Sequence, residues 1–228
     1  MDKKESLALY GKGRDAWNAW ANDMLAKKAE LEKYEPWQMD DTGHRISEVT
    51  KVWERNSRVV FSEHSFEEDA DFSGFIFPFA VCFNKVIFEA NADFQVAIFS
   101  YDVIFRNAVF CVDADFTETK FKRFTDFSKA TFRHYAVFYD AIFSGKASFR
   151  GVTFCSDAEF QNATFSGNAM FENATFSGNA MFENATFSGK AMFYKAEFSG
   201  AAIFDDTKFG GATWFNDAIF SNSLNFDR

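Results

Sequence analysis

Residues 162–183 read NATFSGNAMFENATFSGNAMFE, an 11-residue segment followed at once by an identical copy. A third copy, changed at two positions, fills residues 184–194. The phenylalanines of this stretch belong to a longer series in which 31 phenylalanines, from Phe61 to Phe226, follow one another at alternating gaps of five and six residues. We call them the ruler phenylalanines. Three of the 34 phenylalanines lie outside the series: Phe75, Phe79 and Phe124.

The ruler predicts short strands rather than a helix. Right-handed coiled coils also have an 11-residue period. On a helix that turns about 100° per residue, however, successive ruler phenylalanines would point to opposite sides, too sparsely for a packed seam. Along a strand, the residue two positions earlier faces the same way as the phenylalanine, and here it is mostly Ala, with some Val and Thr. Turn-forming Ser, Gly, Asn and Asp commonly follow. We therefore predict an all-β solenoid with Phe and small residues inside.

Several units resemble the repeats of the pentapeptide-repeat family, whose pattern is Ala, a polar residue, Leu or Phe, and two turn residues. They include Ala163-Thr-Phe-Ser-Gly, Ala174-Thr-Phe-Ser-Gly and Ala196-Glu-Phe-Ser-Gly. The resemblance covers about residues 61–226. Residues 13–20, GRDAWNAW, are similar to a Gly-x-x-x-Trp-Asn-x-Trp lead that precedes the repeats in some members. The resemblance implies a right-handed quadrilateral β-helix, in which four units would form a coil of 22 residues.

We predict two regions, an α-helical N-terminal cap over residues 1–60 and a pentapeptide-repeat β-helix over residues 61–228. Apolar residues recur at three- and four-residue intervals from residue 6 to 33, which predicts a helix, interrupted near Gly11 and Gly13. Pro36 is expected to end this helix, and residues 40–43 are expected to form a turn. A second short helix, starting near Ser47, is predicted from the apolar residues Ile46, Val49, Val52 and Trp53. Such a cap covers the first coil and blocks edge-to-edge stacking.

Composition and charge narrow the classes of function. The sequence has neither an 18-residue apolar run nor the apolar stretch of a signal peptide, so we expect a cytoplasmic protein that does not bind membranes. Three cysteines do not suggest a disulfide framework. The net charge of −9 falls entirely on residues 61–228, which contain 13 Lys and Arg against 22 Asp and Glu. Direct nucleic-acid binding is not expected, because it depends on Lys and Arg neutralising phosphates.

The 22-residue coil sorts the outward residues that precede each ruler phenylalanine into columns. One column holds Asp71, Asp93, Asp115, Val137 and Glu159, an acidic ladder that is either a solvated face or a contact for a cationic partner. A column on the opposite face holds Met170, Met192 and Trp214, which reflect either copying of the repeat or an apolar contact surface for a partner or a second copy. A final coil around Leu224 and Phe226 is a further candidate for end-to-end pairing.

No enzyme, metal or cofactor is predicted. The sequence lacks a Gly-rich phosphate loop and a nucleophile motif. Cys111, His134 and Cys155 fall near one corner on successive layers, but the two cysteines would be about 9.6 Å apart, too far to share a tetrahedral metal. A short outward row of threonines suggests ice binding, but a row of three is weak evidence for it: Thr131, Thr153 and Thr175.

The prediction is a non-catalytic scaffold or protein-interaction module with an unidentified protein partner and a possible homodimer. The alternative, implied by the resemblance, is a DNA-mimicking protein that binds a type II topoisomerase such as gyrase. The acidic surface and rod shape favour this alternative. The unbroken ruler leaves no room for the projecting loops on which some of those family members depend.

Overall fold

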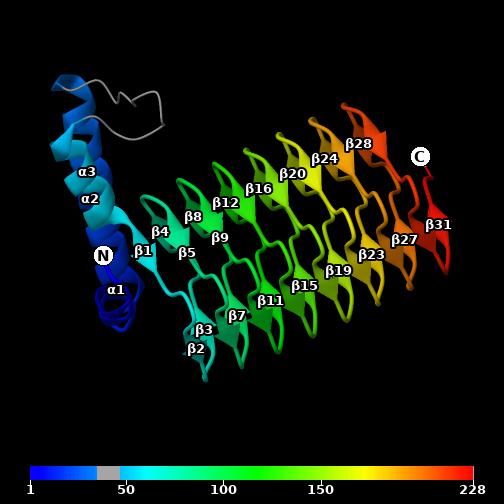
Figure 1. Ribbon diagram of the computed structural model, residues 1–228, viewed down its shortest axis with the longest axis horizontal. Coiled ribbons are helices and arrows are strands. Elements are labelled where there is room, and N and C mark those ends of the chain that lie inside the picture. The colour runs from blue at the N-terminus through cyan, green and yellow to red at the C-terminus, as the bar shows by residue number, and fades with distance from the viewer. Residues whose placement is uncertain (35–46, 228) are drawn as a thin grey trace.

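The computed structural model describes residues 1–34 and 47–227, which form three helices followed by 31 two-residue strands. The helices are α1 (Lys3–Tyr10), α2 (Arg14–Tyr34) and α3 (Glu48–Ser57). They lie at one end of a stack of coils, and the C-terminus lies at the other end (Figure 1). Within the described residues, no helix is both long and apolar enough to cross a membrane.

The helical segment differs in one respect from the prediction of two helices. The interruption expected near Gly11 and Gly13 separates α1 from α2 completely, so there are three helices. Gly13 adopts a left-handed φ of +82°, which favours glycine and ends the helical path. The other predicted helix is α3, with Ser47 as its N-cap residue. Pro36, the turn at residues 40–43 and Ile46 lie outside the described residues.

The strands form four parallel sheets, one on each side of a quadrilateral solenoid, as the resemblance to pentapeptide repeats implies. Sheet 1 contains β1 (Val59–Val60), β5 (Val81–Cys82), β9 (Val103–Ile104), β13 (Thr125–Asp126), β17 (Ala147–Ser148), β21 (Ala169–Met170), β25 (Ala191–Met192) and β29 (Thr213–Trp214). Sheet 2 contains β2 (Ser65–Phe66), β6 (Ile87–Phe88), β10 (Val109–Phe110), β14 (Thr131–Phe132), β18 (Thr153–Phe154), β22 (Thr175–Phe176), β26 (Glu197–Phe198) and β30 (Ile219–Phe220).

The other two sides have the same construction. Sheet 3 contains β3 (Ala70–Asp71), β7 (Ala92–Asp93), β11 (Ala114–Asp115), β15 (Ala136–Val137), β19 (Ala158–Glu159), β23 (Ala180–Met181), β27 (Ala202–Ile203) and β31 (Leu224–Asn225). Sheet 4 contains β4 (Ile76–Phe77), β8 (Ile98–Phe99), β12 (Lys120–Phe121), β16 (Ile142–Phe143), β20 (Thr164–Phe165), β24 (Thr186–Phe187) and β28 (Lys208–Phe209).

The register confirms the 22-residue coil. Val59 pairs with Val81 in sheet 1, and the same offset holds in the other three sheets, as in the pairing of Phe121 with Phe143. The ruler phenylalanines stack face to face along the interior; the Phe143 ring lies 4.7 Å from both Phe121 and Phe165. The Phe and Ala core is thus a continuous column of stacked side chains behind all four sheets.

The alternating gaps produce two kinds of corner. In each five-residue unit, the second residue after the phenylalanine adopts a left-handed conformation, such as Asn162 at φ 59°. The N–H of the following residue donates to the phenylalanine carbonyl, as Ala163 does to Phe160 at 3.1 Å, and this is the geometry of a type II turn. In the wider six-residue corners, Asp or Asn side chains often bond to the next coil; Asp157 Oδ1, for example, accepts from the Asn179 N–H at 2.7 Å.

The helices close the first coil with aromatic rings. Trp17 is fully buried and stacks on Phe61, while Tyr10 lies 4.6 Å from Phe72 between ring centroids. The Trp17 indole N–H donates to the Ile76 carbonyl at 2.8 Å. α1 and α2 therefore continue the ring column and bond to the edge of the first coil, as expected of a cap.

Candidate functional site

The acidic ladder is a column on the outside of sheet 3. Asp71, Asp93, Asp115, Val137 and Glu159 lie on five adjacent rungs. Asp71 is exposed, and the other four are half-buried. The structure thus brings the four predicted acidic residues together, and their part in binding stays a prediction.

Three of these carboxylates are fixed by their own turns. Oδ1 of Asp71, Asp93 and Asp115 each accepts a hydrogen bond, at 2.8 Å, from the backbone N–H two residues later. The Gln95 side chain also donates to Asp115 Oδ2 at 2.8 Å. The ladder therefore has a structural role in shaping the corners, and it presents negative charge in a set geometry.

Burial, and to a smaller extent the crowding of charge, affects the protonation of two ladder carboxylates. Burial raises the pKa of the Asp93 carboxyl above its ordinary value; Asp115 and Asp71 raise it further, and the hydrogen bond from the Gln95 N–H opposes them. Burial likewise raises the pKa of Glu159, with further contributions from Asp157, Asp115 and Glu183. These carboxylates repel one another, so a positive partner would relieve the repulsion.

The acidic surface is wider than the single predicted column. We define a face as the outward residues at positions three and one before, and one and two after, the ruler phenylalanines of one sheet. The face on sheet 3, the acidic face, contains no Lys or Arg within residues 69–227. Its acidic residues are Asp69, Asp71, Asp93, Asp113, Asp115, Glu118, Asp140, Asp157, Glu159, Glu183, Asp205, Asp206 and Asp227. Applying the 22-residue period to the corner positions as well would have revealed these thirteen residues from sequence.

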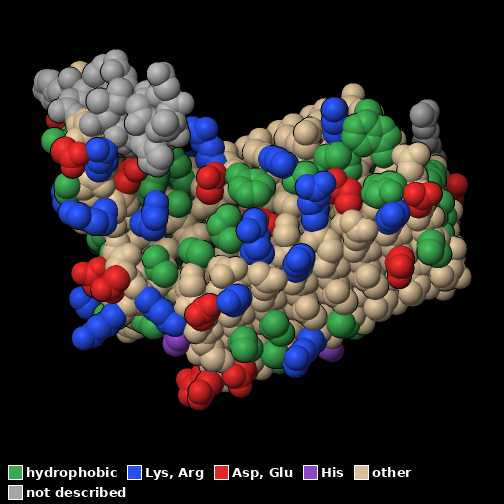
Figure 2. All heavy atoms as spheres, in the orientation of Figure 1, with side chains coloured by type: hydrophobic (Ala, Val, Ile, Leu, Met, Phe, Trp, Pro, Cys, Tyr) green, Lys and Arg blue, Asp and Glu red, His purple; other side chains and the backbone are tan. Residues whose placement is uncertain are grey.

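The face on sheet 1, on the opposite side of the solenoid, carries more Lys and Arg than Asp and Glu, and we call it the basic face. Its basic residues are Arg58, Lys85, Arg106, Lys129, Lys146, Arg150, Lys190 and Lys195. Its acidic residues are Glu63, Asp102, Asp126, Glu172 and Asp217. One long side of the coils carries Lys and Arg interspersed with hydrophobic side chains and with some Asp and Glu (Figure 2). Sequence reasoning missed this face, because it followed only the position before each phenylalanine.

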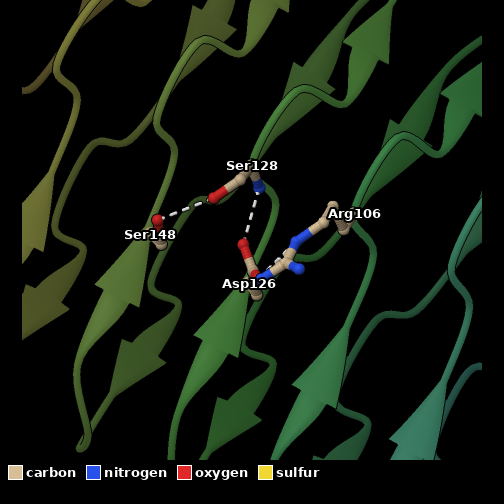
Figure 3. Close-up of polar contacts among 4 residues, drawn as sticks. All are labelled: Arg106, Asp126, Ser128 and Ser148. Carbon is tan, nitrogen blue, oxygen red and sulfur yellow. Dashed lines mark hydrogen bonds and ion pairs between the residues drawn. The ribbon is translucent and has the colours of Figure 1, made fainter.

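Two of the acidic residues on the basic face are buried in ion pairs. Asp126 is 1% exposed and accepts from Arg106 Nε at 3.1 Å (Figure 3). Its other oxygen accepts from the Ser128 N–H at 2.9 Å. Glu172 accepts from Arg150 Nη2 at 2.8 Å. The arginines stay more than half exposed, so the outermost charge at these two ion pairs is positive.

Only part of the predicted apolar stripe is exposed at the surface. Met170, Met192 and Trp214 do lie on adjacent rungs of sheet 1. Met170, however, is 4% exposed, so the expectation that it forms part of an exposed stripe is wrong. It packs between neighbouring rungs, and the paired Arg150 and Glu172 occupy the adjoining turns. Met192 is half-buried and Trp214 is 40% exposed, with Lys190 Nζ 5.2 Å from its ring centroid.

The remaining candidate features are separate from these faces. Leu224 and Phe226 are exposed on the last coil, where pairing stays a prediction. Cys111 and Cys155 do not meet His134, whose Nδ1 pairs with Asp113 instead. In the part of the chain that the structure describes, no cluster of His, Cys, Asp and Glu is arranged to hold a metal. Thr131, Thr153 and Thr175 are aligned on only three rungs.

Comparison with known proteins agrees with this construction. A family model described as pentapeptide repeats (9 copies) matches residues 113–153, 138–186, 154–196 and 182–228. The matches together span half of the chain, and the protein belongs to the pentapeptide-repeat family. Comparisons with curated proteins and with solved structures gave no match.

Proposed function

We propose that the protein is a non-catalytic interaction module whose acidic face binds a positively charged surface of a partner protein. The observation that carries this proposal is the concentration of thirteen carboxylates on one face without a basic residue within 69–227. The phenylalanine column behind the face keeps it rigid, so little conformational entropy is lost on binding. Three free cysteines support a reducing compartment such as the cytoplasm.

Capture from a cell extract tests the proposal with two charge-reversal variants. The acidic-face variant carries Glu118→Lys, Asp140→Lys and Glu159→Lys. Lysine is accepted at the left-handed positions of Glu118 and Asp140, because Lys85, Lys129 and Lys195 occupy equivalent positions in other coils. The sheet 4 variant, a control with the same number of reversals, carries Lys120→Glu, Lys122→Glu and Lys208→Glu, which are all exposed.

We expect the wild type and the sheet 4 variant to retain the same partner proteins on beads, and the acidic-face variant to lose them. Added salt should release the partners, because screening weakens charged contacts. Recovery of the same proteins with the acidic-face variant would contradict the proposal.

A second candidate function is imitation of DNA toward a type II topoisomerase such as gyrase. The acidic face favours it because its charges run along a straight axis. At about 4.8 Å per coil, thirteen charges over about 35 Å give about one per 2.7 Å, compared with one per about 1.7 Å of duplex DNA. A gyrase supercoiling assay with and without a quinolone tests this function. An effect of the wild type that the acidic-face variant lacks would support it, and no effect at micromolar protein would exclude it.

A further inference from the structure

We infer that a second copy of this chain is a partner of the acidic face and that it docks through its basic face. This inference rests on the proposed function, since it identifies a partner for the same surface. The two faces lie on sheets 1 and 3, on opposite sides of the solenoid, so a neighbouring copy placed side by side meets an acidic face with a basic one.

The two faces carry an opposite excess of charge over most of their length. Basic residues of the basic face run from Arg58 to Lys195, and acidic residues of the acidic face run from Asp69 to Asp227. Both faces belong to the same coils, so they have the same rung spacing and straightness. A side-by-side contact can therefore bring several oppositely charged rungs together at once.

Exposed aromatic side chains supply apolar contact on both faces. Tyr135 and Tyr139 are exposed on the acidic face, and Tyr194 and Trp214 are exposed on the basic face. Aromatic residues are enriched at protein interfaces because they bury a large area with few rotatable bonds. Lys195 and Lys190 lie over the Tyr194 and Trp214 rings, so charge and apolar surface are interleaved.

The size of the faces indicates weak association. Each is about 35 Å long and about 17 Å wide, taking about seven layer spacings along the axis and five residues across a strand. Full overlap would bury about 1,200 Å² in total, the lower end of the range for specific interfaces. The net charge of −9 opposes association at long range, but physiological salt screens charges beyond about 8 Å, whereas the facing charges would lie closer.

The symmetry of the contact predicts how association proceeds. It joins two different faces, so each docked copy still has one acidic and one basic face unoccupied. Such a heterologous contact does not close on itself in a straight arrangement. Association should therefore continue past the dimer as the protein concentration rises.

Sedimentation equilibrium of purified full-length protein in 50 mM and 500 mM salt tests the inference. The basic-face variant carries Lys146→Glu, Lys190→Glu and Lys195→Glu, which leave both buried ion pairs intact. It has the same net charge as the sheet 4 variant, −15, because each set of three reversals changes −9 by −6. Circular dichroism checks that every variant is folded.

We expect the average mass of the wild type and of the sheet 4 variant to rise with concentration past that of a dimer in 50 mM salt, and less in 500 mM salt. The acidic-face and basic-face variants should each need at least tenfold more protein to associate. Mixed in equal amounts they should associate again, because the unchanged basic face of one variant meets the unchanged acidic face of the other, and the two reversed faces also have opposite charges.

A wild type that stays monomeric up to about 0.5 mM, a concentration about 500-fold above a micromolar dissociation constant, would overturn the inference. So would a mixture of the two variants that does not associate, or a sheet 4 variant that associates as poorly as the basic-face variant. If the wild type is monomeric yet still captures other proteins through the acidic face, the inference fails and the proposed function stands. If neither occurs, both fail.

Discussion

The side-chain Oδ1 of Asn18 lies 2.9 Å from the backbone nitrogen of Ile76 and accepts its hydrogen bond. Asn18 Nδ2 donates to the Gly74 carbonyl at 2.9 Å, so the side-chain amide acts as a short piece of a preceding strand. In sheet 4, each later coil donates its N–H groups to the coil before it, as Ile98 does to Phe75 at 2.9 Å. Ile76 has no earlier coil, and Asn18 supplies the missing acceptor. Pro78 occupies the position that Ser100 has in the next coil, where the Ser100 N–H donates to the Phe77 carbonyl. Because proline has no N–H, the first coil needs no acceptor at that position.

Replacing this amide should loosen the edge of the first coil. We expect Asn18→Ala to lower the free energy of unfolding by about 1 to 3 kcal/mol, because it leaves the Ile76 N–H without its acceptor. Denaturant titration measures the loss, and hydrogen exchange at Ile76 should accelerate. Asn216→Ala, at an exposed position, is the control and should change stability by less than about 0.5 kcal/mol. Equal effects of the two substitutions would refute the role of Asn18.

The phenylalanine column should be sensitive to a cavity in its middle. Phe143 is fully buried between two stacked rings, so Phe143→Ala should cost about 3 to 5 kcal/mol. Phe226 belongs to the same ruler but is 51% exposed, and Phe226→Ala should cost about 1 kcal/mol or less. Chemical denaturation compares the two. A loss below about 1 kcal/mol for Phe143→Ala would mean that its ring does not support the column.

Glycines at the wide corners should resist substitution where coils touch. A Cβ added to Gly189 would lie 2.5 Å from the Gly167 carbonyl oxygen, which is backbone and cannot swing away. Gly189→Ala should therefore cost about 1 to 3 kcal/mol or more. Gly210 is the matched control, because its added Cβ would meet nothing nearer than 3.4 Å. Thermal unfolding of both variants measures the difference, and a Gly189→Ala protein as stable as Gly210→Ala would show that the coils can separate at little cost.

The acidic ladder should make stability depend on pH. The pKa of Asp93 is raised in the folded protein, so its contribution to stability is fully present below the unfolded pKa and is lost as the pH rises through the folded value. We therefore expect the ionised carboxylate to destabilise the fold at pH 7. Asp93→Asn, which keeps an oxygen to accept from Gln95, should be more stable than the wild type at pH 7, and the difference should vanish below about pH 4.

Glu63 provides a control of opposite sign. The hydrogen bond and positive charge of Lys85 lower the pKa of Glu63, so its contribution is present at neutral pH and is lost as the pH falls through the folded value. Glu63→Gln should therefore be slightly less stable than the wild type at pH 7. Denaturant titrations at several pH values measure both variants. A destabilising effect of Asp93→Asn at pH 7 would contradict the raised pKa of Asp93, which follows from its burial and from its acidic neighbours.

Much of the fold could be predicted from sequence because the ruler determines both the inward positions and the register. Once the coil is 22 residues long, the column from Asp71 to Glu159 follows by arithmetic, and the pairings agree. The burial of Met170 could not be predicted in this way. It depends on how the side chains of neighbouring columns pack over it, which the period does not specify.

The roles of two phenylalanines outside the ruler also could not be predicted from the 22-residue period. Phe75 takes the inward position that Ala usually occupies, and its ring lies 5.3 Å from Trp17. Phe79 lies 5.3 Å from Trp53 of α3. Both residues belong to the first coil and fill the junction with the helices. Their roles, like that of Asn18, depend on where the helices dock, which is a tertiary contact without a repeat to reveal it.

A photo-crosslinking scan tests most directly the central claim that the acidic face is the contact surface. One crosslinking residue is placed in turn at Val137 on sheet 3, Thr153 on sheet 2 and Ile142 on sheet 4, all outward positions that precede a ruler phenylalanine. We predict adducts with partner proteins from Val137 and few or none from the other two positions. Adducts that concentrate at Thr153 or Ile142, with none at Val137, would contradict the claim.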